Sequence, residues 1–261
     1  VYNRGMKITV LTLFPKMIAG FIQESIIKRA QEKGLVEISI VDIRDFAEGT
    51  HKSVDDRPYG GGAGMVMRVD VVERAINSVL SPESSVGSQK RRIILTSPRG
   101  RAFGQKMAEE LSKLEDVIII AGHYEGVDER VVDLIDEEVS IGDFVLTGGE
   151  LPAAVILDSV VRLIPGVLKK EDATSHETFG EVSVKDLQKA VGNHEVVLGL
   201  LKKGIEKVRL LEYPHYSRPQ EYNGVSVPDV LIGGNHKDIQ TWKLQRSFSL
   251  TLKNRPDLLG L

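Results

Sequence analysis

The stretch Ser140-Ile-Gly-Asp-Phe-Val-Leu-Thr-Gly-Gly-Glu-Leu-Pro152 decides how the fold is interpreted. It starts as the end of a β-strand, turns at Gly142 and reaches the pair Gly148-Gly149. A helix is expected next, because an acid and a proline, Glu150 and Pro152, both suit a first helical turn. Paired glycines before a helix let the backbone approach a ligand closely, with unpaired N–H groups pointing at it. The stretch therefore predicts a ligand-binding turn.

Two other strand-to-loop junctions resemble this stretch: Ile93-Ile-Leu-Thr-Ser-Pro-Arg-Gly-Arg101 and Val117-Ile-Ile-Ile-Ala-Gly-His-Tyr-Glu-Gly126. Near the start of the chain, a strand over 7–14, a helix from Pro15 to Gly34 and a strand over 35–43 form a β-α-β unit. Such units build parallel sheets covered by helices. Three similar loops at the carboxyl ends of parallel strands predict one shared crevice.

The composition excludes several classes of protein. The 261 residues suffice for one large domain or two modest ones. The absence of cysteine excludes disulfides, thiolate zinc sites and cysteine nucleophiles, and the six histidines lack metal-ligand spacing. No apolar run reaches the ~20 residues of a membrane span, and no signal-peptide pattern opens the chain, so we expect a cytoplasmic protein without membrane contact.

The charge is distributed unevenly. Residues 1–180 contain 22 Lys and Arg against 28 Asp and Glu, a balance of −6, whereas residues 181–261 contain 12 against 9, a balance of +3. A basic C-terminal third is typical of a surface that meets phosphates, although an ordinary solvated surface explains so mild an excess equally well.

A glycine-dense loop spans His51–Met65. It is not a Walker loop, because Lys and Ser or Thr do not follow its last glycine. Long loops in compact domains are usually lids or binding loops. The charged cluster Asp55, Asp56 and Arg57 beside Tyr59 favours a binding loop over a merely flexible one.

The remaining pattern is mainly helical. A helix over 150–164 places Asp158 and Arg162 on one face, where they suit a structural ion pair. A polar stretch over 169–180 predicts a mobile linker, and helices are expected over 184–191, 195–210 and 235–253, the last one basic. We therefore expect an α/β domain over 1–165, a flexible linker over 166–182 and a small, mainly helical domain over 183–261.

Four phrases together resemble the bacterial tRNA (guanine-N1-)-methyltransferase family, which modifies guanosine 37 beside the anticodon and belongs to the SPOUT superfamily. They are Val54–Met65, Gly122–Arg130, Ser140–Pro152 and the phrase Tyr213-Pro-His-Tyr-Ser-Arg-Pro219. The resemblance covers nearly the whole chain from Met6. It implies an α/β fold whose parallel sheet carries a deep C-terminal trefoil knot, an exception to the rule that chains are unknotted. It also implies a homodimer that binds tRNA with G at position 37 and uses S-adenosyl-L-methionine as methyl donor.

The resemblance implies a cofactor pocket made from the three loops. The matching positions are Ser97, Pro98, Gly122, Tyr124, Glu125, Ile141, Gly142, Leu146, Gly148, Gly149 and Pro152. Backbone groups suit the neutral adenine, and the acid Glu125 suits the positive sulfonium. No dedicated metal site is expected, and any Mg²⁺ would need ligands shared with RNA.

The resemblance also implies catalytic residues. Guanine N1 must lose its proton, and charge developing on O6 needs a donor. The matching base is Glu177, with Asp172 as the alternative, and the matching donor is Arg162, oriented by Asp158 and acting on the partner subunit's site. Further positions that match tRNA contacts are Asp55, Arg57, Asp158, His215, Lys243 and Arg246.

The chain departs from the family pattern at several points. A Glu stands at the base position where Asp is usual, and His123 stands where relatives often have Arg. The segment from Gly180 to Arg209 is longer than the usual connection. Two alternatives stay open here: a knotted methyltransferase acting on another base or position, and a non-catalytic RNA-binding module. A dinucleotide dehydrogenase is disfavoured, because no G-x-G-x-x-G follows the first strand.

Overall fold

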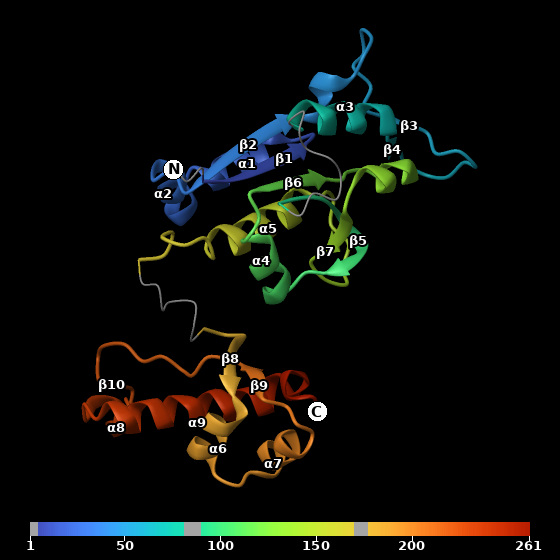
Figure 1. The fold of residues 1–261 in the computed structure, drawn as a ribbon. Helices are drawn as coiled ribbons and strands as arrows, with labels where there is room; N and C mark the ends of the chain where they lie inside the picture. Colours follow the sequence, from blue (N-terminus) through green and yellow to red (C-terminus); the bar gives the residue numbers. More distant parts are fainter. Residues whose placement is uncertain (1–4, 81–89, 170–176) are drawn as a thin grey trace. The chain divides into compact units, whose positions relative to one another are not determined.

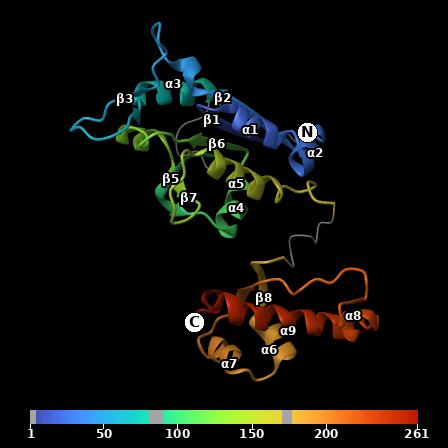
Figure 2. The ribbon, with the colours of Figure 1, turned by 180° about the vertical axis from the view of Figure 1, so that it is seen from behind.

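The computed structural model describes residues 5–80, 90–169 and 177–261. The chain forms two compact units, Val1–Lys169 and Lys170–Leu261, each with its own apolar core. Figures 1 and 2 show the two units from opposite sides. The predicted linker over 166–182 includes 170–176, which lie outside the described residues.

The first unit is built on a five-stranded sheet in which every neighbouring pair is parallel. This confirms the predicted α/β class with a parallel sheet. The strands are, in spatial order, β2 (Val36–Asp42), β1 (Met6–Thr12), β6 (Asp116–Ala121), β5 (Arg91–Ala102) and β7 (Glu137–Ser140). Ile8 aligns with Ile38 on one side and with Val117 on the other, which fixes the register at the centre of the sheet.

Helices cover both faces of this sheet, as its buried apolar strands require. One face packs against α1 (Pro15–Ile22), α2 (Ser25–Glu32), α4 (Gln105–Leu111) and α5 (Glu150–Val161). The other packs against α3 (Val69–Val79) and the 3₁₀ segments η1 (Ile43–Phe46) and η2 (Glu129–Leu134). In Figures 1 and 2, α3 accordingly lies on the opposite side of the sheet from α4 and α5.

Two local features differ from the sequence expectation. The helix expected from Pro15 to Gly34 is divided, because Glu24 is extended and Ser25 has a positive φ of 49°. Strand β5 runs on past Thr96 through an irregularity in its pairing with β7. At that irregularity, Gly100 lies so close to the backbone of Glu138 and Val139 that a Cβ would collide with it. The irregularity forms the first of the three predicted loops.

The second unit combines helices with short antiparallel strands. Strand β8 (Gly180–Ser183) pairs with β9 (Lys207–Leu210), and between them lie α6 (Val184–Val191) and α7 (Glu195–Lys202). These helices share a core with α9 (His236–Asn254) and the 3₁₀ segment η4 (Pro256–Leu259). The small pair β10 (Glu221–Tyr222) and β11 (Val225–Ser226) and the short helix α8 (Asp229–Ile232) complete the unit.

Two expectations about this unit are wrong. The helix expected over 195–210 ends at Lys202, because Gly204 has a positive φ of 71° and turns the chain toward β9. Residues 180–182, expected in a mobile linker, belong to β8 and are hydrogen-bonded to β9. The long 180–209 segment is therefore a hairpin with a pair of helices between its strands.

Candidate active site

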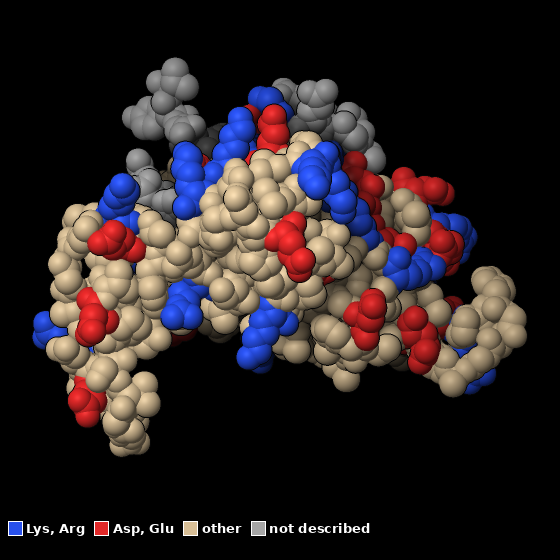
Figure 3. Space-filling model, turned by 90° about the horizontal axis from the view of Figure 1, so that it is seen from below, with Lys and Arg blue, Asp and Glu red and all other residues tan. Residues whose placement is uncertain are grey.

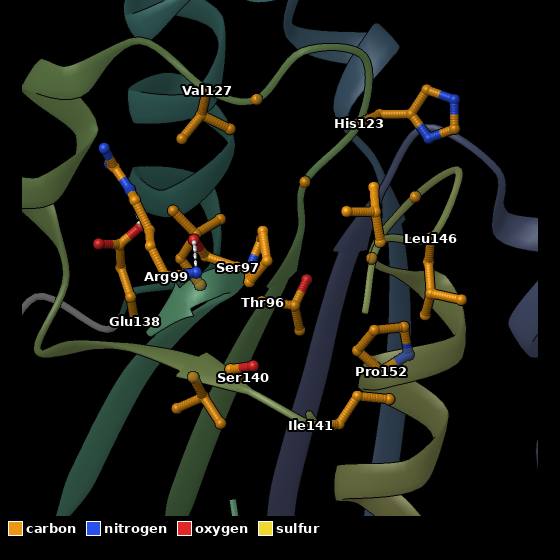
Figure 4. Close-up of a pocket in the computed structure, with 18 of the residues that line it drawn as sticks. Thr96, Ser97, Arg99, His123, Val127, Glu138, Ser140, Ile141, Leu146 and Pro152 are labelled. Carbon is orange, nitrogen blue, oxygen red and sulfur yellow. Dashed lines mark hydrogen bonds and ion pairs between the residues drawn. The ribbon is translucent and has the colours of Figure 1, made fainter. Parts of the chain in front are cut away.

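The three predicted loops meet at one cavity of about 370 Å³ at the carboxyl edge of the sheet. Every residue that the sequence assigned to cofactor binding lines this cavity. Figure 4 shows Ser97 within β5, directly after Thr96, and Ile141 beyond β7 near Pro152, with Leu146 across the cavity from Ser97. The structure thus brings together residues from three loops, as the sequence predicted; their role in cofactor binding stays a prediction.

Backbone hydrogen bonds join the loops to one another. The Gly149 N–H donates to the Gly122 carbonyl oxygen at 2.7 Å, and His123 forms an isolated antiparallel bridge with Gly148. Gly149 must be glycine, because an added Cβ would collide with Thr96 Oγ1 and lie 2.7 Å from the Gly122 nitrogen. The helix start therefore packs directly on the loop that follows β6.

The turn after β7 is fixed by its own short contacts. Gly142 has a φ of 150°, and its N–H donates to Ser140 Oγ at 3.2 Å, while that hydroxyl donates to the Gly142 carbonyl oxygen at 3.1 Å. The Phe144 ring lies against Gly142, at 2.5 Å from where a Cβ would be. These contacts hold the 141–149 backbone along the wall of the cavity.

The glycine-dense loop reaches the same site. It is bounded by β3 (Asp55–Asp56) and β4 (Val66–Met67), which pair with each other. The Glu125 N–H donates to the Met65 carbonyl oxygen at 3.0 Å, and Gly64 lies against the Glu125 side chain. Of the predicted tRNA contacts in this loop, Asp55 is half-buried in β3, whereas Arg57 is exposed. This placement suits a loop that contacts a ligand at the mouth of the cavity.

The cavity also has lining residues that the sequence reasoning missed. Arg99 lies at its wall, where hydrogen bonds to Glu129 and Glu138 raise the pKa of its guanidinium. Its side-chain nitrogens approach these two carboxylates at 2.7 Å and 3.1 Å. Thr96 is buried and its hydroxyl donates to the Ile120 carbonyl oxygen. Arg99 and Thr96 flank the predicted Ser97-Pro98 pair, and this adjacency in the sequence could have identified them as lining residues.

Arg162, the predicted O6 donor, is not among the residues that line this cavity. Arg162 caps the C-terminal end of α5, and its N–H donates to the Asp158 carbonyl oxygen at 3.2 Å. At 1.5 Å per residue, the twelve positions from Glu150 to Arg162 span ~18 Å. Glu177 is half-buried and belongs to the second unit. The alternative base, Asp172, lies outside the described residues.

The second unit gathers the predicted basic tRNA contacts along α9. Lys243 Nζ lies 4.5 Å from the centre of the Tyr213 ring, and the His215 ring is 4.8 Å from the same ring. His215 Nε2 also lies 2.9 Å from Glu212 Oε1. The Arg246 guanidinium lies 5.6 Å from the Trp242 ring. Aromatic and basic groups side by side are typical of surfaces that bind single-stranded RNA.

Charge is mixed on one face of the molecule. On the face drawn in Figure 3, Lys and Arg side chains are interspersed with Asp and Glu side chains.

Among residues 5–80, 90–169 and 177–261, no group of three or more His, Asp or Glu side chains is placed to hold a metal ion. None of the helices formed by these described residues is long and apolar enough to cross a bilayer.

The fold and the cavity define an α/β protein with a cavity of about 370 Å³, lined by glycine turns, at the carboxyl edge of a parallel sheet. Comparison with known sequences gives the family. The family profile described as "tRNA (Guanine-1)-methyltransferase TrmD" matches residues 6–260. The chain belongs to this family, which confirms the resemblance seen in the sequence.

Curated relatives agree with this assignment. The "tRNA (guanine-N(1)-)-methyltransferase" of Geotalea uraniireducens is 47% identical over 255 residues, covering 97% of this chain and 90% of the relative. The proteins of the same name from Carboxydothermus hydrogenoformans and Clostridioides difficile are 46% and 43% identical, again over 97% of this chain. The alignments cover 87% and 97% of those two relatives.

Proposed function

We propose that the chain transfers a methyl group from S-adenosyl-L-methionine to N1 of guanosine 37 in tRNA. Membership of the tRNA (guanine-1)-methyltransferase family supports the reaction class. The single structural observation that carries the proposal is the convergence of three glycine-bearing loops on one cavity. Its size lies within the range of ~300–1,000 Å³ that small-molecule sites usually have.

The residues of the cavity fit such a donor. The 141–149 backbone lines the cavity, where its N–H and C=O groups would suit an uncharged adenine. The Glu125 carboxylate also lines the cavity, where it would attract the positive sulfonium. When bound, the donor supplies an electrophilic methyl group.

The remaining chemistry requires a base and a donor for the guanine. Glu177 would accept the N1 proton, since a protonated N1 is a poor nucleophile. Arg162 would donate to O6, because a guanidinium keeps its charge and offers a fork of N–H donors. Its placement at the far end of α5 from the cavity supports a site shared between two subunits. In that arrangement Arg162 and Glu177 of one chain act on a guanine held beside the partner's cavity.

Several further features belong to this proposal. The sheet order places β5 between β6 and β7 although it precedes both in the chain, which is compatible with the expected trefoil knot. The homodimer follows from the shared site. Lys243, Arg246 and His215 on the second unit would hold the tRNA, together with Asp55, Arg57 and Asp158 on the first. A tRNA substrate in turn supports the cytoplasm as the location.

Methyl transfer to defined transcripts tests the proposal. The purified chain is incubated with methyl-labelled S-adenosylmethionine and either of two tRNA transcripts, one with G37 and one with A37. We expect label on the G37 transcript alone. Equal labelling of both transcripts would mean another position is the target, and donor binding without transfer to either would favour a non-catalytic RNA-binding module.

A further inference from the structure

A buried carboxylate beside the cavity lacks a full set of hydrogen-bond partners. Glu150 at the start of α5 has a side chain only 1% exposed. Thr12 Oγ1 donates to its Oε1 at 2.8 Å, but its Oε2 has no hydrogen-bond partner. A buried unpaired charge is costly, whereas the N-terminus of a helix favours the ionised acid. The carboxyl group therefore calls for a further polar partner near Oε2.

The His123 imidazole is the basic group within reach. Its Nδ1 lies 3.7 Å from Glu150 Oε2, and this nitrogen is also buried without a hydrogen-bond partner. Among the described residues, no other basic nitrogen is recorded within 4.0 Å of the carboxylate. In Figure 4 the His123 ring projects away from Thr96 and Ser97.

Few other ionisable groups surround the imidazole. The Phe14 ring is 4.7 Å from it, with the Arg44 guanidinium 6.0 Å from Phe14, and the Tyr124 ring packs edge-on at 5.1 Å. The next acid along the loop, Glu125, lies against Gly64 instead. Glu150 is thus the anion that faces His123 within the described part of the chain.

The pair encloses the glycine turn of the cavity. A Cβ added at Gly148 would collide with His123 Nδ1 and lie 2.5 Å from Glu150 Oε2. The backbone of His123 bridges to Gly148, and Glu150 follows Gly149 directly. The imidazole and the carboxylate therefore both lie directly against the turn that lines the cavity.

We propose that His123 and Glu150 are positioning residues: the His123 imidazole pairs with Glu150 across Gly148 and holds the Gly148-Gly149 turn in its donor-binding shape. A side chain at position 123 that cannot pair with Glu150 in this way leaves the turn less well held, so the affinity for the donor falls. This inference rests on the proposed use of S-adenosylmethionine.

Calorimetric titration with S-adenosylmethionine tests the role. His123→Arg keeps a basic group opposite Glu150, and His123→Gln replaces it with an uncharged amide. The Arg variant should bind the donor as the wild type does, and the Gln variant should bind it about tenfold more weakly. His236→Gln, an exchange at an exposed histidine of α9, should behave as wild type.

Amide exchange gives a readout independent of the ligand. The Gly149 N–H, which donates to Gly122, should exchange faster in His123→Gln than in the wild-type protein at pH 6, with the fold checked by circular dichroism. Unchanged Gly149 protection together with wild-type affinity in the Gln variant would overturn the role of the pair. Absence of donor binding at any pH would instead refute the proposed cofactor, and this role with it.

Discussion

Replacing Gly149 by alanine tests the geometry of the cavity most sharply. The added methyl group would collide with Thr96 Oγ1 and lie 2.7 Å from the Gly122 nitrogen and 2.9 Å from Ala121 Cα. Two of these three atoms belong to the backbone of β6 and its following loop, which cannot rotate away. The start of α5 must therefore move outward, and the 2.7 Å hydrogen bond from Gly149 to Gly122 is weakened.

The expected cost follows from those two effects. Overpacking a tight site costs about 1–3 kcal/mol and a lost hydrogen bond about 1 kcal/mol, so the free energy of unfolding should fall by about 2–4 kcal/mol. Urea denaturation measures this loss. Calorimetry with S-adenosylmethionine should show weaker binding under conditions where the variant is still folded, because the turn that lines the cavity has shifted.

Gly20→Ala is the matched control. Gly20 lies inside α1, and an added Cβ would meet no heavy atom within 4 Å. The same exchange there should stabilise the protein by about 0.5–1 kcal/mol, because alanine is the better helix former. If Gly149→Ala changed the free energy of unfolding as Gly20→Ala does and bound the donor as the wild type does, the close approach of the helix start to the β6 loop would be refuted.

Four further predictions concern catalysis, RNA binding and pH. Arg162→Ala should nearly abolish methyl transfer while leaving donor binding intact. If the dimer shares its sites, mixing this variant with a Leu146→Arg cavity variant should restore about a quarter of wild-type turnover. Half of the dimers then contain one chain of each variant, and each of these mixed dimers has one intact site. Glu177→Gln should lower turnover by ~10²–10⁴, as loss of a general base does; if Asp172→Asn is the crippling change instead, Asp172 is the base. Neutralising Lys243 and Arg246 should weaken tRNA binding and flatten its salt dependence, measured by filter binding; an unaltered slope would remove α9 from the phosphate contacts. A hydrogen bond from Arg130 holds the pKa of Asp128 at about 2, below its ordinary 3.8. The pair therefore stabilises the fold above pH 3.8, and this stabilisation is lost as the pH falls toward 2. In acid denaturation, Arg130→Gln should lose less stability over this pH range than the wild type.

The sequence predicted the α/β class and the meeting of the three loops because both depend on local signals. Buried apolar runs ending in Gly or Pro mark parallel strands and their carboxyl ends, and such ends meet at one edge of a sheet. The strand order β2-β1-β6-β5-β7 could not be predicted in this way. It depends on long-range pairing, to which the composition of each strand gives no clue.

The errors have local causes as well. The helix expected over 195–210 was wrong because a helical pattern of apolar residues runs across Gly204, and only the tertiary pairing of β9 with β8 decides against it. The role of Glu150 was missed because an acid in a first helical turn is normally exposed. Here the side chain is buried against Thr12 and His123, which come from elsewhere in the chain.

Nucleoside mapping tests the central claim most directly. Unmodified tRNA with G37 is incubated with the chain and methyl-labelled S-adenosylmethionine, digested, and separated by liquid chromatography with mass detection. We predict that the label is found in 1-methylguanosine derived from position 37. Label on another guanine atom, on the ribose or at another position would contradict the proposal that a base and Arg162 prepare guanine N1 for attack.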